Sequence, residues 1–366
     1  MPIVLKEKVN VTKSFIPPLD EYIYYVKQIY NNGLLTNQGP LLKKLENQIC
    51  EKLNLNNFHF VTNGTIALQL ALKALDICDG EIITTPFSYV ATVSAILWER
   101  CKPVFVDIEP ANFTIDIAKI EEKITSKTKA ILPVHIFGYA CDVKGIQKIA
   151  DRYNLKVIYD AAHCFGSSIG GGAMSLLNFG DVSTCSFHAT KLFHTIEGGG
   201  CIVKDKSISD KLELIKRFGH NGDKHYCLGI NAKQSEFHAA MGLSNLPYVE
   251  EIIKERKRVC DLYDELLGHL VQRPEKQKEL NYNYAYYPVI FKDEVQLLRV
   301  LEILNKNNIF PRRYFYPSLN KLPYLDEYQP CPVSEDICSR IACLPLYSDL
   351  KSEKVVEIAK LIKEVL

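Results

Sequence analysis

The sequence lacks several signals that would assign a protein to a class at once. None of its 12 cysteines forms a Cys-x-x-Cys pair, which argues against a redox motif and a zinc site. Neither sign of charge dominates, since 44 Lys and Arg stand against 43 Asp and Glu. A strongly basic nucleic-acid binder is therefore not expected. The sequence also has no internal repeat and no low-complexity linker.

Long apolar segments are missing as well. The longest uncharged apolar stretches are runs such as 130–140, well short of the roughly 18–20 residues of a membrane helix. The first eight residues lack the basic segment and the apolar core of a signal peptide. We therefore expect a cytoplasmic protein whose thiols stay reduced and whose cysteines serve mostly as small buried side chains.

The 366 residues are 47% hydrophobic and 24% charged, which is typical of a soluble globular chain of about two domains. From about residue 58, short β-branched or aromatic runs alternate with amphipathic stretches, a pattern that predicts an α/β fold with a mostly parallel sheet. The expected strands are 58–61, 82–84, 104–107, 130–135 and 155–160, and the expected helices are 65–75, 89–100, 117–124 and 143–153. Two further strands, 182–187 and 200–204, lie so close together that they can depart from the parallel pattern.

The character of the sequence changes at Pro247. A helix is expected over 248–270, and its basic cluster 254–258 is most simply a solvated face. A strand over 286–291 and helices over 295–305 and 352–365 complete a smaller α+β domain. The expected division is therefore 1–246 for the large domain and 247–366 for the small C-terminal domain.

The segment Thr62-Asn63-Gly64-Thr65 follows the first expected strand and opens a helix rich in Ala and Leu. Gly64 permits a tight turn and Thr65 can cap the helix, while the free N–H groups of the first turn form an anion site. A phosphate would fit there. Taken alone, a Gly-Thr helix start is more often only a helix cap.

An otherwise apolar strand delivers Asp160 to its carboxyl end, where ligands of open α/β sheets bind. A carboxylate in that place is costly unless it meets a cation or several donors. A protonated pyridine nitrogen is one such cation, and the N-cap of a following helix is the alternative. His163, three residues later, either hydrogen-bonds a ligand or fills the core.

Lys191 lies just past another expected strand, amid Ser186, His188 and Thr190. Partial desolvation at such a place makes a lysine amine a usable nucleophile for Schiff-base chemistry, whereas a surface turn is the commoner setting for any single lysine. Taken together, the three features favour a cofactor site over the simpler structural explanation of each. An anion site, a strand-end Asp160 and Lys191 are the set that pyridoxal 5'-phosphate requires, because this cofactor is a phosphorylated pyridine aldehyde.

Six segments, in order along nearly the whole chain, carry a family resemblance: NGTIALQLALKAL, ITTPFSYVAT, PVHIFGYACDV, VIYDAAH, SFHATKLFHTIEGG and GINAKQSEFHAAMG. They resemble the DegT/DnrJ/EryC1/StrS family of pyridoxal-phosphate-dependent sugar aminotransferases. Segments 310–325 and 337–350 are similar to its viosamine-forming (dTDP-4-amino-4,6-dideoxyglucose) members. The resemblance implies an aspartate-aminotransferase-like large domain of fold type I with a mostly parallel sheet, plus a smaller α+β C-terminal domain.

The resemblance also implies roles for individual residues. Lys191 matches the lysine that binds the cofactor covalently and later moves the proton, and Asp160 matches the partner of the pyridine nitrogen. His163 stands where many relatives carry Gln, near the ring or its phenolic oxygen, with a hydrogen-bond role that depends on its tautomer. The other implied cofactor contacts are Gly64, Thr65 and Ser186 at the phosphate, Tyr89 on the pyridine face, and Asn231 from the neighbouring subunit.

The implied substrates are small molecules, and the implied assembly is a homodimer with shared active sites. The donor would be L-glutamate and the acceptor a nucleotide-linked 4-keto-6-deoxyhexose, with thymidine diphosphate as the expected nucleotide. The product would serve a surface polysaccharide of the O-antigen type, in lipopolysaccharide biosynthesis. Candidates for binding the acceptor are Lys233, where relatives often have Arg, and Arg312, Arg313, Tyr314 and Tyr316. The alternating Arg and Tyr residues can instead lock the small domain onto the large one.

Two other functions remain open at this point. One is an aminotransferase that acts at C3 of a 3-keto-6-deoxy sugar nucleotide, and the other is a sensor or regulatory protein that keeps the fold without turnover. One branch of the family carries His at the lysine position and dehydrates its substrate, so Lys191 favours amino transfer. No metal, nucleic acid or membrane partner is expected.

Overall fold

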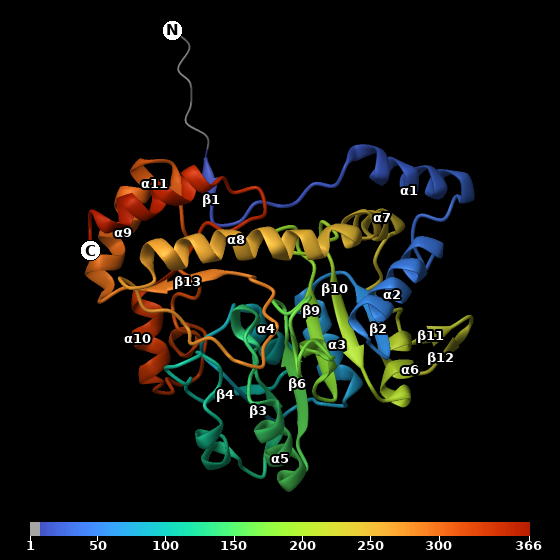
Figure 1. Cartoon of the computed structure of the whole chain (residues 1–366). Helices are drawn as coiled ribbons and strands as arrows, with labels where there is room; N and C mark the ends of the chain where they lie inside the picture. Colours follow the sequence, from blue (N-terminus) through green and yellow to red (C-terminus); the bar gives the residue numbers. More distant parts are fainter. Residues whose placement is uncertain (1–7) are drawn as a thin grey trace.

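A seven-stranded sheet lies at the centre of the computed structural model, which describes residues 8–366 (Figure 1). The strand order is β2-β10-β9-β6-β5-β3-β4, and all neighbours are parallel except at β10, which runs antiparallel to β2 and β9. The expected sheet, with its departure at the second strand pair, is confirmed. Its strands are β2 (Asn57–Val61), β3 (Glu81–Thr84), β4 (Lys102–Phe105), β5 (Thr128–Leu132), β6 (Lys156–Asp160), β9 (Val182–Ser186) and β10 (Gly199–Val203).

Side chains of the sheet alternate between two apolar layers. Ile82 packs into the layer beneath α3, α4 and α6, whereas Ile83 packs into the opposite layer against α5. Ile158 and Val157 divide in the same way. Successive strand residues point to opposite faces, so a sheet covered on both sides needs strands that are apolar throughout. These helices are α3 (Gly64–Ala74), α4 (Ala91–Trp98), α5 (Val143–Tyr153) and α6 (Lys206–Ile215).

Three more helices cover the end of the sheet near β2. Ile29 of α1, Leu45 of α2 and Leu243 of α7 join one buried cluster with Phe58 and Phe60 of β2. None of these helices was expected from the sequence pattern. Their bounds are α1 (Leu19–Asn32), α2 (Pro40–Leu53) and α7 (Glu236–Asn245).

The C-terminal part is built on α8 (Val249–Leu267), which runs across the molecule from α7 towards α9 and α11 (Figure 1). The expected helices and strand are confirmed as α8, α9 (Glu294–Lys306), α11 (Ser352–Lys363) and β13 (Tyr287–Ile290). The pattern did not reveal α10 (Pro332–Arg340) or β15 (Ile341–Leu344), which pairs antiparallel with β13.

The N-terminal strand does not join the central sheet. Instead β1 (Val9–Asn10) pairs in parallel with β14 (Ile309–Phe310), and Val9 is buried in the core of the C-terminal part. The division into 1–246 and 247–366 stays a prediction, with this strand as a crossover between the two parts. Residues 1–7 lie outside the described residues.

The expected helix over 117–124 is wrong. The structure has two short 3-10 turns there, Ile117–Lys119 and Glu121–Lys123, and the Asp116 side chain caps the first by accepting from the Ala118 N–H. Ile120 is the buried residue of this stretch, so one anchoring side chain replaces the continuous apolar face that a helix packs with. The remaining strands are β7 (Ser168–Ile169), β8 (Met174–Ser175), β11 (His220–Asn221) and β12 (Lys224–His225).

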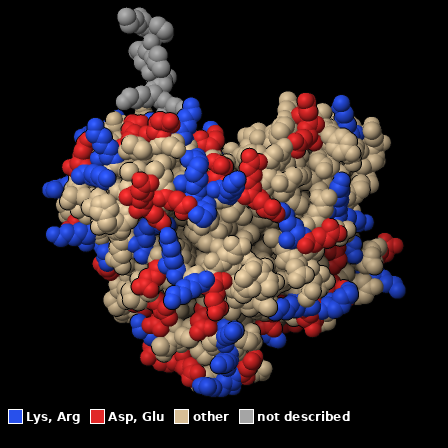
Figure 2. All heavy atoms as spheres, in the orientation of Figure 1, with Lys and Arg blue, Asp and Glu red and all other residues tan. Residues whose placement is uncertain are grey.

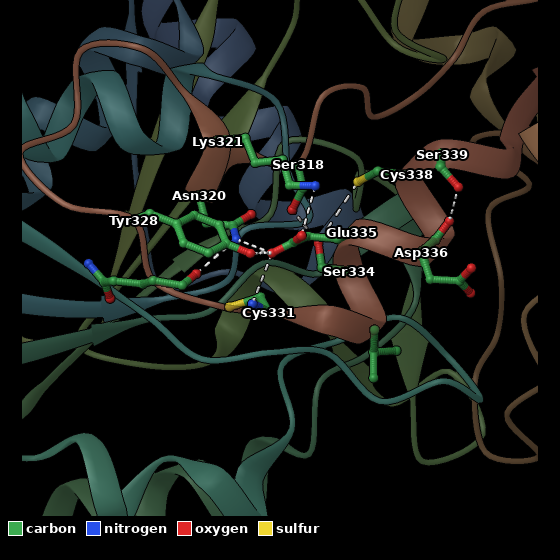
Figure 3. Close-up of polar contacts among 12 residues, drawn as sticks. Ser318, Asn320, Lys321, Tyr328, Cys331, Ser334, Glu335, Asp336, Cys338 and Ser339 are labelled. Carbon is green, nitrogen blue, oxygen red and sulfur yellow. Dashed lines mark hydrogen bonds and ion pairs between the residues drawn. The ribbon is translucent and has the colours of Figure 1, made fainter.

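Glu335 of α10 holds the loop that precedes this helix (Figure 3). Its carboxylate accepts hydrogen bonds from Asn320 and Tyr328, at 2.7 and 2.6 Å, and pairs with Lys321 at 2.7 Å. Burial acts to raise the pKa of Glu335, but these contacts outweigh it and lower the pKa to about 2. The loop is therefore tied to α10 by a carboxylate that stays charged.

The same segment is fastened to the edge of the central sheet. The Gln329 side chain accepts from the Phe105 N–H at 2.8 Å and donates to the Pro103 carbonyl at 3.0 Å, so it occupies the free edge of β4. Asp107, just past β4, accepts from the N–H groups of Val333 and Ser334, both at 2.9 Å, and so caps α10. These contacts fix 329–334 against the edge of the sheet.

The surface carries both signs of charge interspersed, as the face in Figure 2 shows. Within residues 8–366, no helix is long and apolar enough to cross a membrane, and no cluster of three or more His, Cys, Asp or Glu could hold a metal ion. The twelve cysteines are free thiols and most are buried. Burial raises the pKa of thiols such as Cys185, to about 12, which leaves them unreactive.

Candidate active site

A cavity of about 510 Å³ opens at the carboxyl ends of β6 and β9, beside the N-terminus of α3. Residues from both parts of the chain line it, because the segment around Arg312 closes one side. The sequence-predicted residues that line it are Gly64, Thr65, Tyr89, Asp160, His163, Ser186, Lys191, Arg312 and Tyr314.

Four predicted residues do not line this cavity. Arg313 turns away and binds Glu294 at 2.6 Å and the Ser339 carbonyl at 2.8 Å. Its guanidinium also lies 3.5 Å from the ring centre of Tyr316. The two other residues, Asn231 and Lys233, follow the hairpin β11–β12 and lie outside the cavity of their own chain.

Asp160 is buried at the end of β6 with two hydrogen-bond donors. The Thr92 hydroxyl of α4 donates to Oδ2 at 2.7 Å, and the Ala162 N–H donates to Oδ1 at 3.2 Å. Burial raises the pKa of Asp160, and these two contacts and the charge of Lys191 act to lower it. Both hydrogen-bond donors to this buried carboxylate are neutral, so a cationic N–H group in the cavity would stabilise its charge further. A protonated pyridine nitrogen is such a group.

The N-terminus of α3 lies on the cavity wall where the sequence predicts an anion site, and the helix cap differs from the prediction. Asn63 caps the helix by accepting from the Ile66 N–H at 2.9 Å, so Thr65 is not the cap and its hydroxyl is left for other partners. At Gly64, a Cβ atom would lie only 3.1 Å from the Ser186 Cβ. This close approach leaves the first-turn N–H groups beside the Ser186 hydroxyl, an arrangement that fits a phosphate.

The tautomer of His163 is fixed by the backbone. The Phe137 N–H donates to His163 Nδ1 at 3.2 Å, so Nδ1 must be an acceptor and the neutral ring carries its proton on Nε2. Burial, and then the charge of Lys191, lowers the pKa of His163 well below its ordinary value. His163 is therefore a neutral N–H donor, as a Gln amide would be, and it fits the phenolic oxygen of a pyridoxal ring.

Lys191 ends a tight turn after β9 in which its N–H donates to the His188 carbonyl at 2.8 Å. Burial lowers the pKa of its amine, although nearby groups, Tyr314 and Asp160 among them, act to raise it. Its Nζ lies 3.5 Å from the hydroxyl oxygen of Tyr286. The sequence pattern did not reveal Tyr286 as a site residue, because this tyrosine begins an expected strand and so resembles a core aromatic.

The cavity thus fits pyridoxal phosphate at three separate points: an anion cradle, a buried carboxylate and a desolvated amine. A family model decides the assignment, since the model of the DegT/DnrJ/EryC1/StrS aminotransferase family matches residues 19–363. The chain belongs to this family. The predicted family, the fold and the class of enzyme, a pyridoxal-phosphate-dependent sugar-nucleotide aminotransferase, are confirmed.

Individual members of the DegT/DnrJ/EryC1/StrS family match the chain over nearly its whole length. Two dTDP-4-amino-4,6-dideoxy-D-glucose transaminases are 40% identical to it; that of Shigella dysenteriae covers 99% of this chain and 100% of its own, and that of Escherichia coli 97% and 98%. The structure of DesI with its TDP-sugar product has a TM-score of 0.92 at 27% identity, over 99% of this chain and 94% of that one.

Proposed function

We propose that the protein transfers the amino group of L-glutamate to C4 of a nucleotide-linked 4-keto-6-deoxyhexose. The nucleotide is thymidine diphosphate, and the product is a 4-amino-4,6-dideoxy sugar nucleotide. The likeness to two transaminases of this kind supports the acceptor. The single structural observation that supports the chemistry is the placement of the Lys191 amine, the Asp160 carboxylate and the α3 N-terminus on the walls of one cavity.

Pyridoxal phosphate, when bound, supplies a ring that withdraws electrons from the carbon that loses its proton. The N-terminus of α3 and Ser186 would hold its phosphate, and the ring of Tyr89, which is 55% exposed and lines the cavity, would pack against the pyridine. Asp160 would keep a proton on the pyridine nitrogen. His163 would donate from Nε2 to the phenolic oxygen.

Lys191 moves the proton in both halves of the reaction. Its desolvated amine would take a proton from the α-carbon of the donor as a general base and then, as a general acid, deliver it to the C4′ carbon of the cofactor. In the second half the same amine works in the reverse order on the sugar. Arg312 and Tyr314 line the cavity on the side of the C-terminal part, where we place the diphosphate and the sugar.

Product analysis tests this function. The purified protein is supplied with pyridoxal phosphate, L-glutamate and dTDP-4-keto-6-deoxyglucose, and the product is examined by NMR. We expect an amine at C4 and one 2-oxoglutarate for each amine formed. Amination of a 3-keto sugar nucleotide, with the 4-keto compound left unchanged, would instead establish the C3 alternative.

A single-turnover reaction separates an enzyme from a regulatory member of the fold. Glutamate alone should bleach the yellow protein and release 2-oxoglutarate in proportion to the number of active sites. A protein that binds the cofactor and releases no 2-oxoglutarate would be a sensor. A protein that takes up no cofactor would contradict both functions.

We propose a homodimer in which each active site receives residues from the partner. Two observations support a second copy as the partner: Asn231 and Lys233 lie outside their own cavity, and large apolar side chains are exposed on α1 and around the hairpin β11–β12. The exposed residues are Leu19, Tyr24, Tyr30, Phe218, Tyr226 and Leu228.

Subunit complementation tests the shared site. Lys191→Ala and Asn231→Ala variants are each expected to be nearly inactive, whereas dimers that contain one subunit of each kind keep one site with both residues intact. Mixing the unfolded variants and refolding them together should therefore restore part of the activity. No recovery, or a monomer in sedimentation, would contradict the proposal.

We also propose a cytoplasmic location and a role in the synthesis of an O-antigen type of surface polysaccharide. The substrates are nucleotide sugars, which are made and used inside the cell, and this supports the location. Deletion of the gene should remove the amino sugar from the surface polysaccharide and leave the 4-keto precursor in cell extracts. An unchanged polysaccharide would contradict this role.

A further inference from the structure

Within the described residues, the side-chain hydrogen bond of the Lys191 amine is to Tyr286, with 3.5 Å between Lys191 Nζ and the Tyr286 hydroxyl oxygen. This distance is at the long end for a hydrogen bond, and active-site hydrogen bonds are often long until the ligands are in place. A second, smaller cavity that both Lys191 and Tyr286 line has a volume of only about 10 Å³, room for one water at most. Among residues 8–366 the amine forms no ion pair, although the charge of Asp160 acts on it from farther away.

The backbone around Tyr286 is fastened on three sides. Asn283, which is fully buried, donates to the carbonyls of His163 and Phe165 at 2.7 and 2.9 Å, and so ties this segment to the cavity wall. The Tyr282 hydroxyl hydrogen-bonds with the carbonyl of Tyr286 at 3.1 Å. The Tyr286 ring is in edge contact with the His163 ring, with 4.9 Å between the ring centres.

Arg256 supplies the third attachment. Its guanidinium donates to the Tyr284 carbonyl at 2.9 Å and to the Ala285 carbonyl at 2.6 Å. The expectation that the basic cluster 254–258 is a solvated face is wrong for this residue, which is only 4% exposed. Burying a guanidinium without an acidic partner within the described residues is costly. Here its hydrogen bonds hold the backbone of the two residues before Tyr286 in place.

We propose that Tyr286 is a positioning residue for Lys191: its hydroxyl oxygen accepts a hydrogen bond from the protonated amine and holds it towards the cavity. During the reaction Lys191 carries a proton between two carbon atoms, and a buried ammonium needs an acceptor in that interval. The hydroxyl of Tyr286 supplies it without taking the proton, because burial raises the pKa of this phenol and keeps it neutral. This role in the reaction rests on the proposed function.

Competitive labelling of amines measures the contact without the reaction. The full-length protein, freed of cofactor and checked for folding by circular dichroism, is treated with acetic anhydride at a series of pH values. Mass spectrometry then compares Lys191 with Lys206, whose exposed side chain serves as an internal reference. The midpoint of the pH dependence of labelling reports the pKa of each amine. In Tyr286→Phe the Lys191 ammonium loses its acceptor, so its midpoint should fall by about half to one pH unit.

Tyr284→Phe is the matched control, because it removes a hydroxyl from the same segment but outside the cavity, and its midpoint should equal that of the wild type. Arg256→Lys keeps the charge but loses the paired contacts with two carbonyls, so it should shift the midpoint in the same direction as Tyr286→Phe, by less. An unchanged midpoint in a folded Tyr286→Phe protein would overturn the proposal.

Kinetics of the loaded enzyme supply the second readout. We expect Tyr286→Phe to lower kcat by about tenfold and to change the KM for glutamate by less than about twofold, since the lost contact acts on proton transfer. Unchanged kcat and KM would contradict the catalytic part of the proposal. A shifted midpoint in a protein that catalyses no amino transfer would refute the proposed function and leave the contact established.

Discussion

The hydroxyl of Thr92 donates to Asp160 Oδ2 at 2.7 Å, and the Thr92 hydroxyl oxygen lies 2.7 Å from the Ser88 hydroxyl oxygen. Because the proton of Thr92 is used on the carboxylate, Ser88 must donate in the second contact. Ser88 lies in the loop just before α4 and Thr92 in the first turn of this helix, so the junction of loop and helix aligns a chain of hydroxyl groups on the carboxylate. The orientation and charge of Asp160 thus depend on an element that the sequence places 68 residues away.

Removal of this hydroxyl should shift the pH dependence of the reaction. The Thr92 contact lowers the pKa of Asp160, so Thr92→Val raises that pKa and leaves more of the carboxyl protonated at a given pH. We expect the acidic limb of the kcat/KM profile to move up by about one pH unit or less. Thr92→Ser, which retains the hydroxyl, serves as the control; equal profiles for Val and wild type would contradict this coupling.

Replacement of Lys191 should abolish the chemistry but not the fold. In Lys191→Ala no amine is left to bind the cofactor covalently or to move the proton, and general acid–base catalysis typically contributes 10²- to 10⁴-fold. We expect the yellow absorbance to be missing and 2-oxoglutarate release to fall by at least about 10²-fold. Lys191→Arg keeps the positive charge and should be equally inactive; substantial turnover in either variant would assign the proton transfer to another group.

The tautomer of His163 leads to a prediction about its replacements. A Gln amide can donate as Nε2 does, so His163→Gln should keep activity within about tenfold of the wild type. His163→Phe keeps a ring but has no N–H, and it leaves the Phe137 N–H without an acceptor, which costs about 1–3 kcal/mol. Spectra and kcat of the two loaded variants provide the measurement, and equal losses for Gln and Phe would refute a donor role.

Two neighbouring arginines should behave differently. Arg312 lines the cavity, whereas Arg313 is held by Glu294 and the Ser339 carbonyl. We expect Arg312→Ala to raise the KM for the sugar nucleotide by at least about tenfold, the effect of one lost charge-assisted contact, with less change for glutamate. Arg313→Ala should chiefly lower the thermal midpoint of unfolding. Kinetics and calorimetry of both proteins distinguish the roles, and the reverse pattern would move the diphosphate to Arg313.

The Glu335 cluster should stabilise the protein in a defined pH range. The pKa of Glu335 is about 2 in the folded protein and about 4.3 when unfolded, so its stabilisation is present above the unfolded value and is lost as the pH falls through the folded one. We expect Glu335→Gln to lower the free energy of unfolding by about 1–3 kcal/mol at pH 7. Urea titrations should show this difference shrinking towards pH 2, and a difference independent of pH would contradict the assignment.

Local patterns sufficed for the strands that are buried on both faces and for helices with one continuous apolar face. The strands that end at Val61 and Asp160 are short apolar runs, and the helix between Val143 and Tyr153 repeats its apolar residues at helical spacing. Helices α1, α2 and α7 were missed, although in α2 Leu41, Leu45 and Ile49 recur at helical spacing. What no local window contains is the packing of these helices onto each other and onto β2. The opposite error occurred over 117–124, where helix-like residues have too little buried surface to support a helix.

The sequence by itself determined the chemistry, since a strand-end Asp160, a Gly-Thr helix start and Lys191 occur in the order and spacing that one cofactor requires. Only the tertiary structure decided how these groups are tuned. The proton of His163 is placed by the Phe137 N–H, Asp160 is held by Thr92, and Lys191 meets Tyr286 from the C-terminal part. These partners lie between 26 and 95 residues away along the chain, and a hydrogen bond depends on distance in space, which folding alone sets.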